Sequence, residues 1–275
     1  ESAPMTSGPD QPALAARLQA RSLTTGYGER TIISDLDVQV PDGSFTVIIG
    51  PNGSGKSTLL RSLVRLIRPT SGTVLLDGAD IAQTKSKQLA RQIGLLPQAS
   101  IAPEGITVID LVSRGRHPHQ SALKRWSEHD ERAVQGALAR TRLADLTTRV
   151  VDELSGGQRQ RVWIAMALAQ ETPILLLDEP TTYLDISHQI DVLDLCTSLH
   201  REGRTLVAVL HDLNQAARYA THLIVLQDGH IVARGTPADI VTEELIRRVF
   251  GVGARVIADP ETNSPLIVPH APVFS

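Results

Sequence analysis

The stretch GPNGSGKST, residues 50–58, combines glycines, a lysine and hydroxyl side chains at a spacing suited to phosphate chemistry. It follows the apolar run 45–49 and opens a helical pattern, so amides at the start of a helix would face an anion. Gly50 and Gly55 permit a loop with inward amides, and Lys56 would reach the β- and γ-phosphates of a nucleotide. A functionless glycine-rich turn is the alternative, but a chance match to four fixed positions arises in about one chain in a hundred. We therefore predict that the whole stretch binds a nucleotide: Gly50, Pro51, Asn52, Gly53, Ser54, Gly55, Lys56, Ser57 and Thr58.

The segment ILLLDEP, residues 174–180, is an apolar run that ends in two adjacent carboxylates. A buried parallel strand presents such groups at the carboxyl edge of its sheet. Asp178 could hold Mg²⁺ through water beside the hydroxyl of Ser57, and Glu179 could accept a proton from an attacking water. Alone, Asp-Glu-Pro is an ordinary strand-end turn, but together with the lysine stretch it favours nucleotide hydrolysis. The next buried run, TLVAVLHD, ends at His211, whose imidazole could donate to a γ-phosphate or position the water, although a lone strand-end histidine is usually structural.

A third candidate is ELSGGQRQR, residues 153–161, in which Ser155 and two glycines stand just ahead of a helical pattern. Its amides and helix dipole suit a phosphate, yet no lysine is present to grip one. These residues therefore predict half of a phosphate site and leave open whose phosphate it holds.

These segments require a scaffold that brings strand ends and helix starts together. Apolar, β-branched runs at 45–50, 174–180 and 205–212 alternate with helical patterns, which indicates a parallel sheet flanked by helices. Residues 16–49 and 72–78 are instead typical of antiparallel strands, with turns at VPDGS and LLDGAD.

The middle and the end of the chain have patterns of their own. Between Gln98 and Gly156 the strand signal stops, and ITVIDLVSRGR, SEHDERAVQGALART and DLTTRVVDEL predict helices of an inserted lobe, at about residues 99–164. From residue 222 the pattern predicts a hairpin turning at the Asp-Gly pair 228–229 and then one or two helices. The role of residues 251–275 stays open.

The composition bounds the class of protein. With 275 residues, 41% of them hydrophobic, the chain can form one large domain with a lobed insertion. A net charge of −3 with scattered lysine and arginine argues against nucleic-acid binding by charge. No apolar run approaches the roughly 20 residues that span a bilayer, the first residues lack the order of a signal peptide, and the single cysteine, Cys196, fits a buried role in a reducing compartment. We expect residues 1–12 to be disordered, residues 13–268 to form the nucleotide-binding domain, and residues 269–275 to form a tail.

In order and spacing, these motifs resemble the nucleotide-binding subunits of ATP-binding-cassette (ABC) transporters over about residues 14–268. The segment LSGGQ, residues 154–158, is similar to the signature of that family and is the most specific single motif. The resemblance implies an α/β fold with a P-loop NTPase (RecA-like) core, an antiparallel β subdomain and the inserted α-helical lobe. It also implies ATP and Mg²⁺ as cofactors.

The resemblance assigns roles to further residues. Tyr27 in TTGYGER matches the aromatic residue that stacks on adenine, Gln98 in LLPQ matches the glutamine that senses Mg²⁺ and the γ-phosphate, and Asp185 in TTYLD matches the aspartate at the dimer seam. Residues 155–158 would close over ATP held by residues 50–58, the lysine loop, of a second subunit. The resemblance therefore implies a homodimer with two head-to-tail composite sites. The implied catalytic residues are Glu179, His211, Gln98 and Lys56; the metal ligands are Ser57, Gln98 and Asp178; the signature contacts are Ser155, Gly156, Gly157 and Gln158.

Three classes compete for this pattern: an importer or exporter motor, a soluble ABC protein acting on ribosomes or DNA, and a P-loop kinase or GTPase without transport. LSGGQ disfavours the last class, soluble members usually carry two cassettes or a long coiled coil, and exporters usually fuse a membrane span to the cassette. Four stretches, residues 113–121, 125–134, 153–195 and 255–269, are similar to ATPases of ferric siderophore importers, whose relatives carry haem and cobalamin. The resemblance thus implies two membrane permease subunits, indirect contact with a substrate-binding protein, no nucleic acid, and a place at the cytoplasmic face of a bacterial membrane.

The iron association suggests a metal site at RHPHQ, residues 116–120. His117 and His119 are only two residues apart with a proline between them, and no cysteine or carboxylate lies close in sequence. We expect instead a loop of the helical lobe near the membrane partner.

Overall fold

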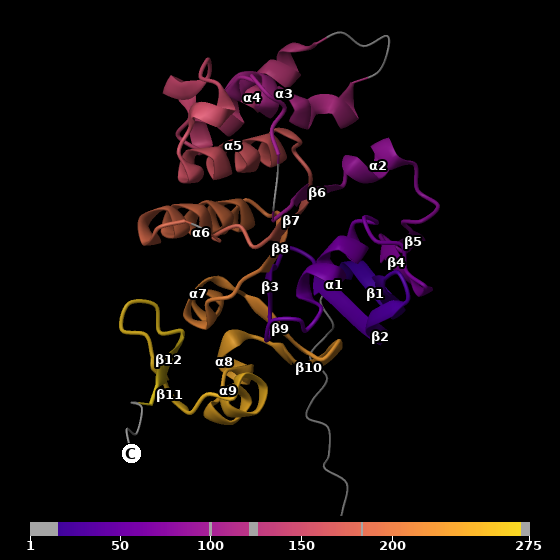
Figure 1. The fold of residues 1–275 in the computed structure, drawn as a ribbon, viewed down its shortest axis with the longest axis vertical. Helices are drawn as coiled ribbons and strands as arrows, with labels where there is room; N and C mark the ends of the chain where they lie inside the picture. The colour runs from indigo at the N-terminus through magenta and orange to yellow at the C-terminus, as the bar shows by residue number, and fades with distance from the viewer. Residues whose placement is uncertain (1–15, 99–100, 121–125, 183, 271–275) are drawn as a thin grey trace, which may run out of the picture.

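The computed structural model of the chain describes residues 16–98, 101–120, 126–182 and 184–270. The predicted disorder of residues 1–12 and most of the predicted tail lie outside these residues. A core of two larger sheets and their helices carries a helical lobe at one end of the long axis (Figure 1). In the part of the chain that is described, no helix has both the length and the apolar character to cross a bilayer.

A six-stranded sheet forms the centre of the core. Its strands are β3 (Phe45–Ile49), β6 (Ile93–Leu96), β7 (Ile174–Asp178), β8 (Thr205–Val209), β9 (His222–Gln227) and β10 (His230–Gly235). They are arranged in the order β10-β9-β3-β8-β7-β6, and all neighbours run parallel except β10, which pairs antiparallel with β9. The predicted parallel sheet is confirmed, and β6 is an addition that the sequence patterns did not reveal.

Both faces of this sheet are covered, as its continuous apolar strands require. Leu175 and Leu177 of β7 belong to one apolar core, whereas Ile174 and Leu176 belong to the other. The larger core includes the buried sides of α5 (Gly156–Ala169), α6 (Ile186–Arg201) and α7 (Leu213–Tyr219), and the smaller core includes α1 (Lys56–Leu63). Alternate residues of each strand thus fix the helices on opposite faces.

A four-stranded antiparallel sheet, in the order β2-β1-β4-β5, covers the smaller core. It consists of β1 (Ala16–Tyr27), β2 (Arg30–Pro41), β4 (Ser71–Leu76) and β5 (Ala79–Asp80). The antiparallel prediction is confirmed for residues 16–41 and 71–80 but is wrong for 45–49, because β3 pairs in parallel with β8 and β9. All five residues of β3 are buried, which requires two covered faces.

The predicted helical lobe is confirmed between the core segments. It contains α3 (Val108–Ser113), the 3₁₀ helices η1 (Arg114–His119), η2 (Ala144–Leu146) and η3 (Val151–Glu153), α4 (Glu128–Arg140) and α5. The helix predicted for DLTTRVVDEL is wrong, because this segment forms only η2 and η3. Its backbone pairs elsewhere: the Val108 amide donates to the Arg149 carbonyl, and the Val151 amide donates to the Ile106 carbonyl.

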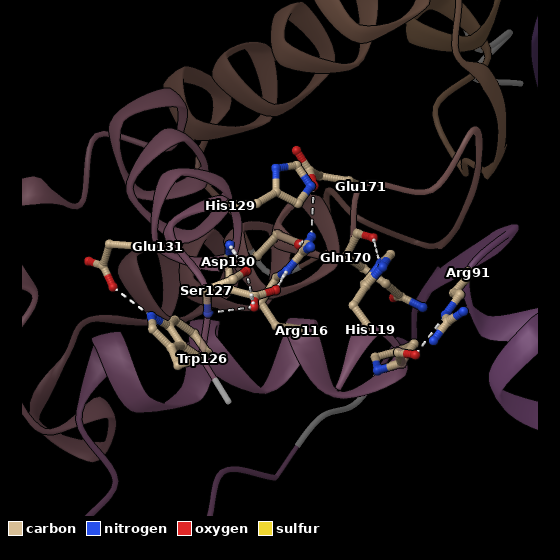
Figure 2. Close-up of polar contacts among 12 residues, drawn as sticks. Arg91, Arg116, His119, Trp126, Ser127, His129, Asp130, Glu131, Gln170 and Glu171 are labelled. Carbon is tan, nitrogen blue, oxygen red and sulfur yellow. Dashed lines mark hydrogen bonds and ion pairs between the residues drawn. The ribbon is translucent and has the colours of Figure 1, made fainter. Parts of the chain in front are cut away.

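A buried arginine joins η1 to the other lobe elements (Figure 2). Arg116 is fully buried, and its guanidinium donates to the Asp130 carboxylate at 2.9 Å, the Ala169 carbonyl at 2.7 Å and the Glu171 carboxylate at 2.8 Å. A buried guanidinium is costly unless several acceptors surround it. These contacts therefore fix η1 against the start of α4 and the end of α5.

The histidines of RHPHQ have structural surroundings. His119 Nε2 lies 2.8 Å from the Gln170 carbonyl, and Arg91, which follows α2 (Ser86–Ala90), donates to the Pro118 carbonyl at 2.8 Å (Figure 2). Within the described ranges, no group of three or more His, Cys, Asp or Glu side chains could hold a metal ion. The expected loop is wrong for residues 116–119, which belong to η1 because Arg116 and His119 anchor this turn to the end of α5.

The ion pair of Asp130 gives a testable pH dependence. Burial alone would raise the pKa of Asp130, but hydrogen bonds from Ser127 and Arg116 outweigh it and lower the pKa from 3.8 to about 2. Because the folded-state pKa is the lower one, this carboxylate stabilises the fold fully above the unfolded-state pKa, and the contribution is lost as the pH falls through the folded-state pKa. Between about pH 5 and pH 3, we expect urea unfolding to show about 1 kcal/mol more loss of stability for the parent than for Asp130→Asn. Asp145→Asn, at an exposed aspartate, should follow the parent; equal losses in the parent and Asp130→Asn would contradict the role of Asp130.

The C-terminal part begins as predicted, with the β9–β10 hairpin turning at Asp228-Gly229, followed by α8 (Pro237–Ile240) and α9 (Glu243–Phe250). A second hairpin then follows, β11 (Ala254–Ala258) with β12 (Pro265–Pro269). Asn214 of α7 donates to the Ile267 carbonyl at 3.2 Å and accepts from its amide at 2.7 Å. The hairpin is thus held against the helix that follows His211.

Candidate functional site

The loop formed by residues 50–58 encloses the Lys56 side chain between β3 and α1. Lys56 is only 6% exposed, and its ammonium donates to the Gly50 and Pro51 carbonyls at 2.9 Å each. Burial lowers the pKa of Lys56, and the carboxylates of Glu179 and Asp178 oppose this effect in part. The ammonium is therefore a desolvated cation, which an anion in the loop would stabilise.

Backbone geometry explains the glycines of this loop. A Cβ at Gly50 would lie 2.0 Å from the Leu226 carbonyl oxygen, and Gly55 has a φ of 100° at the start of α1. Asn52 and Gly53 are exposed, whereas Ser54, Gly55 and Thr58 are buried. The Ser54 hydroxyl oxygen is buried and has no hydrogen-bond partner among the described residues, which fits a group that a bound ligand completes.

Asp178, at the end of β7, lies directly beside this loop. Its side chain is 1% exposed, and the Ser57 hydroxyl donates to its Oδ1 at 2.7 Å. Arg61 contacts the other oxygen, Oδ2, through Nε at 3.1 Å and through its second terminal nitrogen at 3.0 Å. The sequence analysis missed Arg61, although its place four residues after Ser57 on α1 puts both on one face of the helix.

Glu179 is the central acceptor of the site. Its Oε2 accepts from Gln98 Nε2 at 2.6 Å and from the Thr182 hydroxyl at 3.1 Å, and its Oε1 lies 2.7 Å from His211 Nε2. The side chain is 10% exposed, and the backbone has a left-handed φ of 55°, which is strained for a residue with a Cβ. The structure thus brings Gln98, Glu179 and His211 together as the resemblance implied, and it adds Thr182.

The oxygen atoms here fit a magnesium ion. Ser57, Asp178 and Gln98 offer hydroxyl, carboxylate and amide oxygens, the hard ligands that Mg²⁺ takes. Ser57 and Asp178 are already in contact, and Gln98 reaches the neighbouring Glu179. Mg²⁺ usually takes only one or two carboxylates and completes its shell with phosphates and waters, so this sparse donor set is adequate.

Tyr27 lies at the end of β1 and is 50% exposed. One terminal nitrogen of Arg61 donates to its hydroxyl at 3.4 Å. Arg61 therefore connects the aromatic residue predicted to stack on a base with the carboxylate predicted to hold the metal.

The LSGGQ segment starts α5 in a second cluster. Ser155 is the N-cap, and its hydroxyl accepts from the Gln158 amide at 3.3 Å while the Gln158 side chain accepts from the Ser155 amide at 3.0 Å. This capping box leaves the side of Gly156 open, because a Cβ there would meet no atom within 4 Å. The amides at this helix start are suited to a phosphate from outside.

Asp185 belongs to the same cluster as LSGGQ. It caps α6, and its Oδ1 lies 2.7 Å from the His188 ring nitrogen. A Cβ at Gly157 would lie 3.4 Å from that ring, so His188, which the sequence analysis missed, stands between Asp185 and LSGGQ. Among the residues that the structure describes, no hydrogen bond or ion pair joins residues 155–158 to the lysine loop, and Figure 1 shows α5 and α1 well apart along the long axis.

Relatives share this sequence over most of its length. The petrobactin import ATP-binding protein FpuD of Bacillus anthracis is 54% identical over 92% of this chain and 93% of that protein. The ferric enterobactin transport ATP-binding protein FepC of Escherichia coli (strain K12) is 58% identical over 92% of this chain and 94% of that protein. The cobalamin import ATP-binding protein BtuD of Halobacterium salinarum is 42% identical over 86% of this chain but only 60% of that protein.

Solved structures of ABC proteins share the fold of this chain. An ABC transporter in an inward-facing conformation superposes with a TM-score of 0.79 at 29% identity, over 94% of this chain and 98% of that chain. The dimeric structure of MJ0796, a bacterial ABC transporter cassette, gives a TM-score of 0.71 at 31% identity, over 80% of this chain and 98% of that chain. The family profile described as ABC transporter matches residues 33–182. The chain therefore belongs to the ABC transporter family and is one of its ATP-binding subunits.

Proposed function

We propose that the chain is the ATP-hydrolysing subunit of an importer for a ferric siderophore, working as a head-to-tail homodimer on two permease subunits at the cytoplasmic face of a bacterial membrane. One observation carries the hydrolytic part: Glu179 is held between Gln98 and His211 at 2.6 and 2.7 Å, next to Asp178 and the buried Lys56. The siderophore class rests on two relatives named for ferric enterobactin and petrobactin, each matched over almost its full length. The cobalamin relative is less identical and is matched over a smaller part of its length, which makes a haem or cobalamin importer the second candidate.

The chain's own residues suggest how ATP would be bound and cleaved. Lys56 and the amides of residues 50–58 would hold the β- and γ-phosphates, and Tyr27 would stack on the adenine. Mg²⁺, held by Ser57, Asp178 and Gln98, would neutralise charge that develops on the transferred phosphoryl group.

Glu179 would accept the proton of the attacking water. His211 and Gln98 hold its two carboxylate oxygens in place, so the base does not need to reorganise during the reaction.

A second copy would complete each site. The LSGGQ segment has exposed amides at a helix start but no lysine, and the lysine loop of the same chain has no described bond to it. Two copies related by a two-fold axis would each supply LSGGQ and Asp185 to the nucleotide of the other. The dimeric form of the MJ0796 cassette supports this arrangement.

A groove between the end of α1 and α2 is the candidate for the permease contact. Its lining is mixed: Val64, Leu66, Leu89 and Leu95 stand beside Arg65, Ser86 and Gln170. Leu66 is 63% exposed, and an exposed apolar side chain at the edge of a groove is typical of a protein contact.

Loss of the gene tests the proposed substrate. We expect a deletion strain under iron limitation to lose growth on, and uptake of, at least one ferric siderophore, because the permeases would lack their source of energy. A plasmid carrying the parent gene should restore uptake, and a Lys56→Ala gene should not. Normal uptake of all tested ferric siderophores with a defect in haem or cobalamin uptake would favour the second candidate. Unchanged uptake of every nutrient would contradict the proposal.

A further inference from the structure

In the part of the chain that the structure describes, the side chains that donate to the Asp178 carboxylate both come from α1. With 1% of its side chain exposed, it cannot rely on water, and its two oxygens accept from Ser57 and from Arg61. Arg61 approaches Oδ2 through two nitrogens, at 3.0 and 3.1 Å. A carboxylate this buried is strongly destabilising unless a cation pairs with it.

Arg61 is the cation that performs this pairing. The other cation nearby, the ammonium of Lys56, donates to the carbonyls of Gly50 and Pro51 and makes no described hydrogen bond to Asp178. Arg61 is itself held from a second side, by its contact with the Tyr27 hydroxyl at 3.4 Å. Its guanidinium therefore occupies a fixed place beside the metal ligand.

We propose that Arg61 is the resident counter-cation of Asp178 and that it prevents a divalent cation from binding there until a nucleotide brings further negative charge. The inference rests on the proposed function, in which Asp178 is a ligand of Mg²⁺. In the nucleotide-free protein, Arg61 already neutralises Asp178, so a second cation would be repelled at short range. The phosphates of ATP add enough negative charge to hold Arg61 and the metal together. Metal and nucleotide would then enter as one unit.

Binding of Mn²⁺ to the full chain without nucleotide tests this directly, with free Mn²⁺ followed by electron paramagnetic resonance. We expect Arg61→Gln to bind Mn²⁺ at least about tenfold more tightly than the parent, because a unit charge a few ångströms away is removed. Arg61→Met, which keeps an apolar stem, should show the same gain and replaces the glutamine variant if that variant does not fold. Arg68→Gln removes the same charge at an exposed position past the end of α1 and should match the parent.

A further substitution tests whether the additional Mn²⁺ binds at Asp178. Adding Asp178→Asn to Arg61→Gln should abolish the gain, and a gain that survives this change would overturn the proposal. Affinities of Arg61→Gln and Arg61→Met within twofold of the parent would also overturn it.

A different result is expected if Asp178 is not a ligand of the metal at all. In that case Asp178→Asn should bind Mn²⁺ in the presence of ATP with the affinity of the parent. If that affinity falls while Arg61→Gln shows no gain, the metal site stands and only the role of Arg61 is rejected.

Discussion

Replacing Glu179 by glutamine is expected to lower steady-state ATP hydrolysis by about 10²- to 10⁴-fold while ATP binding is kept. The amide has the size of the carboxylate and can still accept one hydrogen bond, but it cannot take the proton of the attacking water. Lys56, the loop amides and Asp178 are all kept, so the phosphate contacts remain. Phosphate release measures turnover, and the fluorescence of a labelled nucleotide measures affinity.

The matched control for this prediction is Glu244→Gln, the same change at an exposed glutamate of α9. It should hydrolyse ATP at the rate of the parent. Hydrolysis by Glu179→Gln within threefold of the parent would remove Glu179 from the role of general base.

A mixed dimer, in which each copy carries a different inactivating substitution, is expected to trap up to one ATP. A homodimer with either substitution should trap almost none. One copy carries Lys56→Ala and the other Gly157→Asp, and both carry Glu179→Gln to prevent turnover. If sites form across the dimer, one site receives both lesions and the other keeps a normal lysine loop and a normal LSGGQ segment. If sites form within a chain, each site receives one lesion and neither closes. Radiolabelled ATP retained after gel filtration measures the trapped nucleotide.

The structure supports the choice of Gly157. The atoms nearest to a Cβ there belong to the His188 ring, at an ordinary contact distance of 3.4 Å, so the fold should tolerate the change. The added carboxylate would repel a γ-phosphate. Gly157→Ala adds the Cβ without the charge, and its homodimer should still trap ATP.

An empty mixed dimer would count against the composite site, or against one ATP being enough to close it. A nucleotide-dependent disulfide between Ser155→Cys of one copy and Asn52→Cys of the other separates these two outcomes. The natural Cys196 should not interfere, because it is buried and burial raises the pKa of its thiol to about 12.

Local sequence patterns predicted those parts of the fold that depend only on residues near in sequence. The lysine loop, the strand before Asp178 and the β9–β10 turn each have a short-range cause, and each is confirmed. The sequence pattern of residues 45–49 fits both the parallel and the antiparallel sheet, because it does not show which strands pair with this segment. Only the observed pairing with β8 and β9 assigns it to the parallel sheet. The predicted helix at 145–154 failed for a similar reason, since its backbone bonds to residues 106–109.

The site shows the same limit. Motif spacing found Lys56 and Glu179 because each has a fixed place in a recognisable segment, GPNGSGKST or ILLLDEP. It missed Arg61, Thr182 and His188, whose roles depend on what they contact in the folded chain. The sequence analysis also missed the β11–β12 hairpin, which pairs over five residue pairs and is held by Asn214 of α7.

The left-handed backbone at residue 179 implies a conflict between two kinds of selection. A residue with a Cβ at this φ costs about 1 to 2 kcal/mol, which glycine would avoid. Glycine would relieve this strain, but it would also remove the contacts of the carboxylate with Gln98, Thr182 and His211. Stability engineering that scores each position by backbone preference alone would choose glycine and would delete the proposed general base. Backbone preference is therefore the wrong criterion at residue 179.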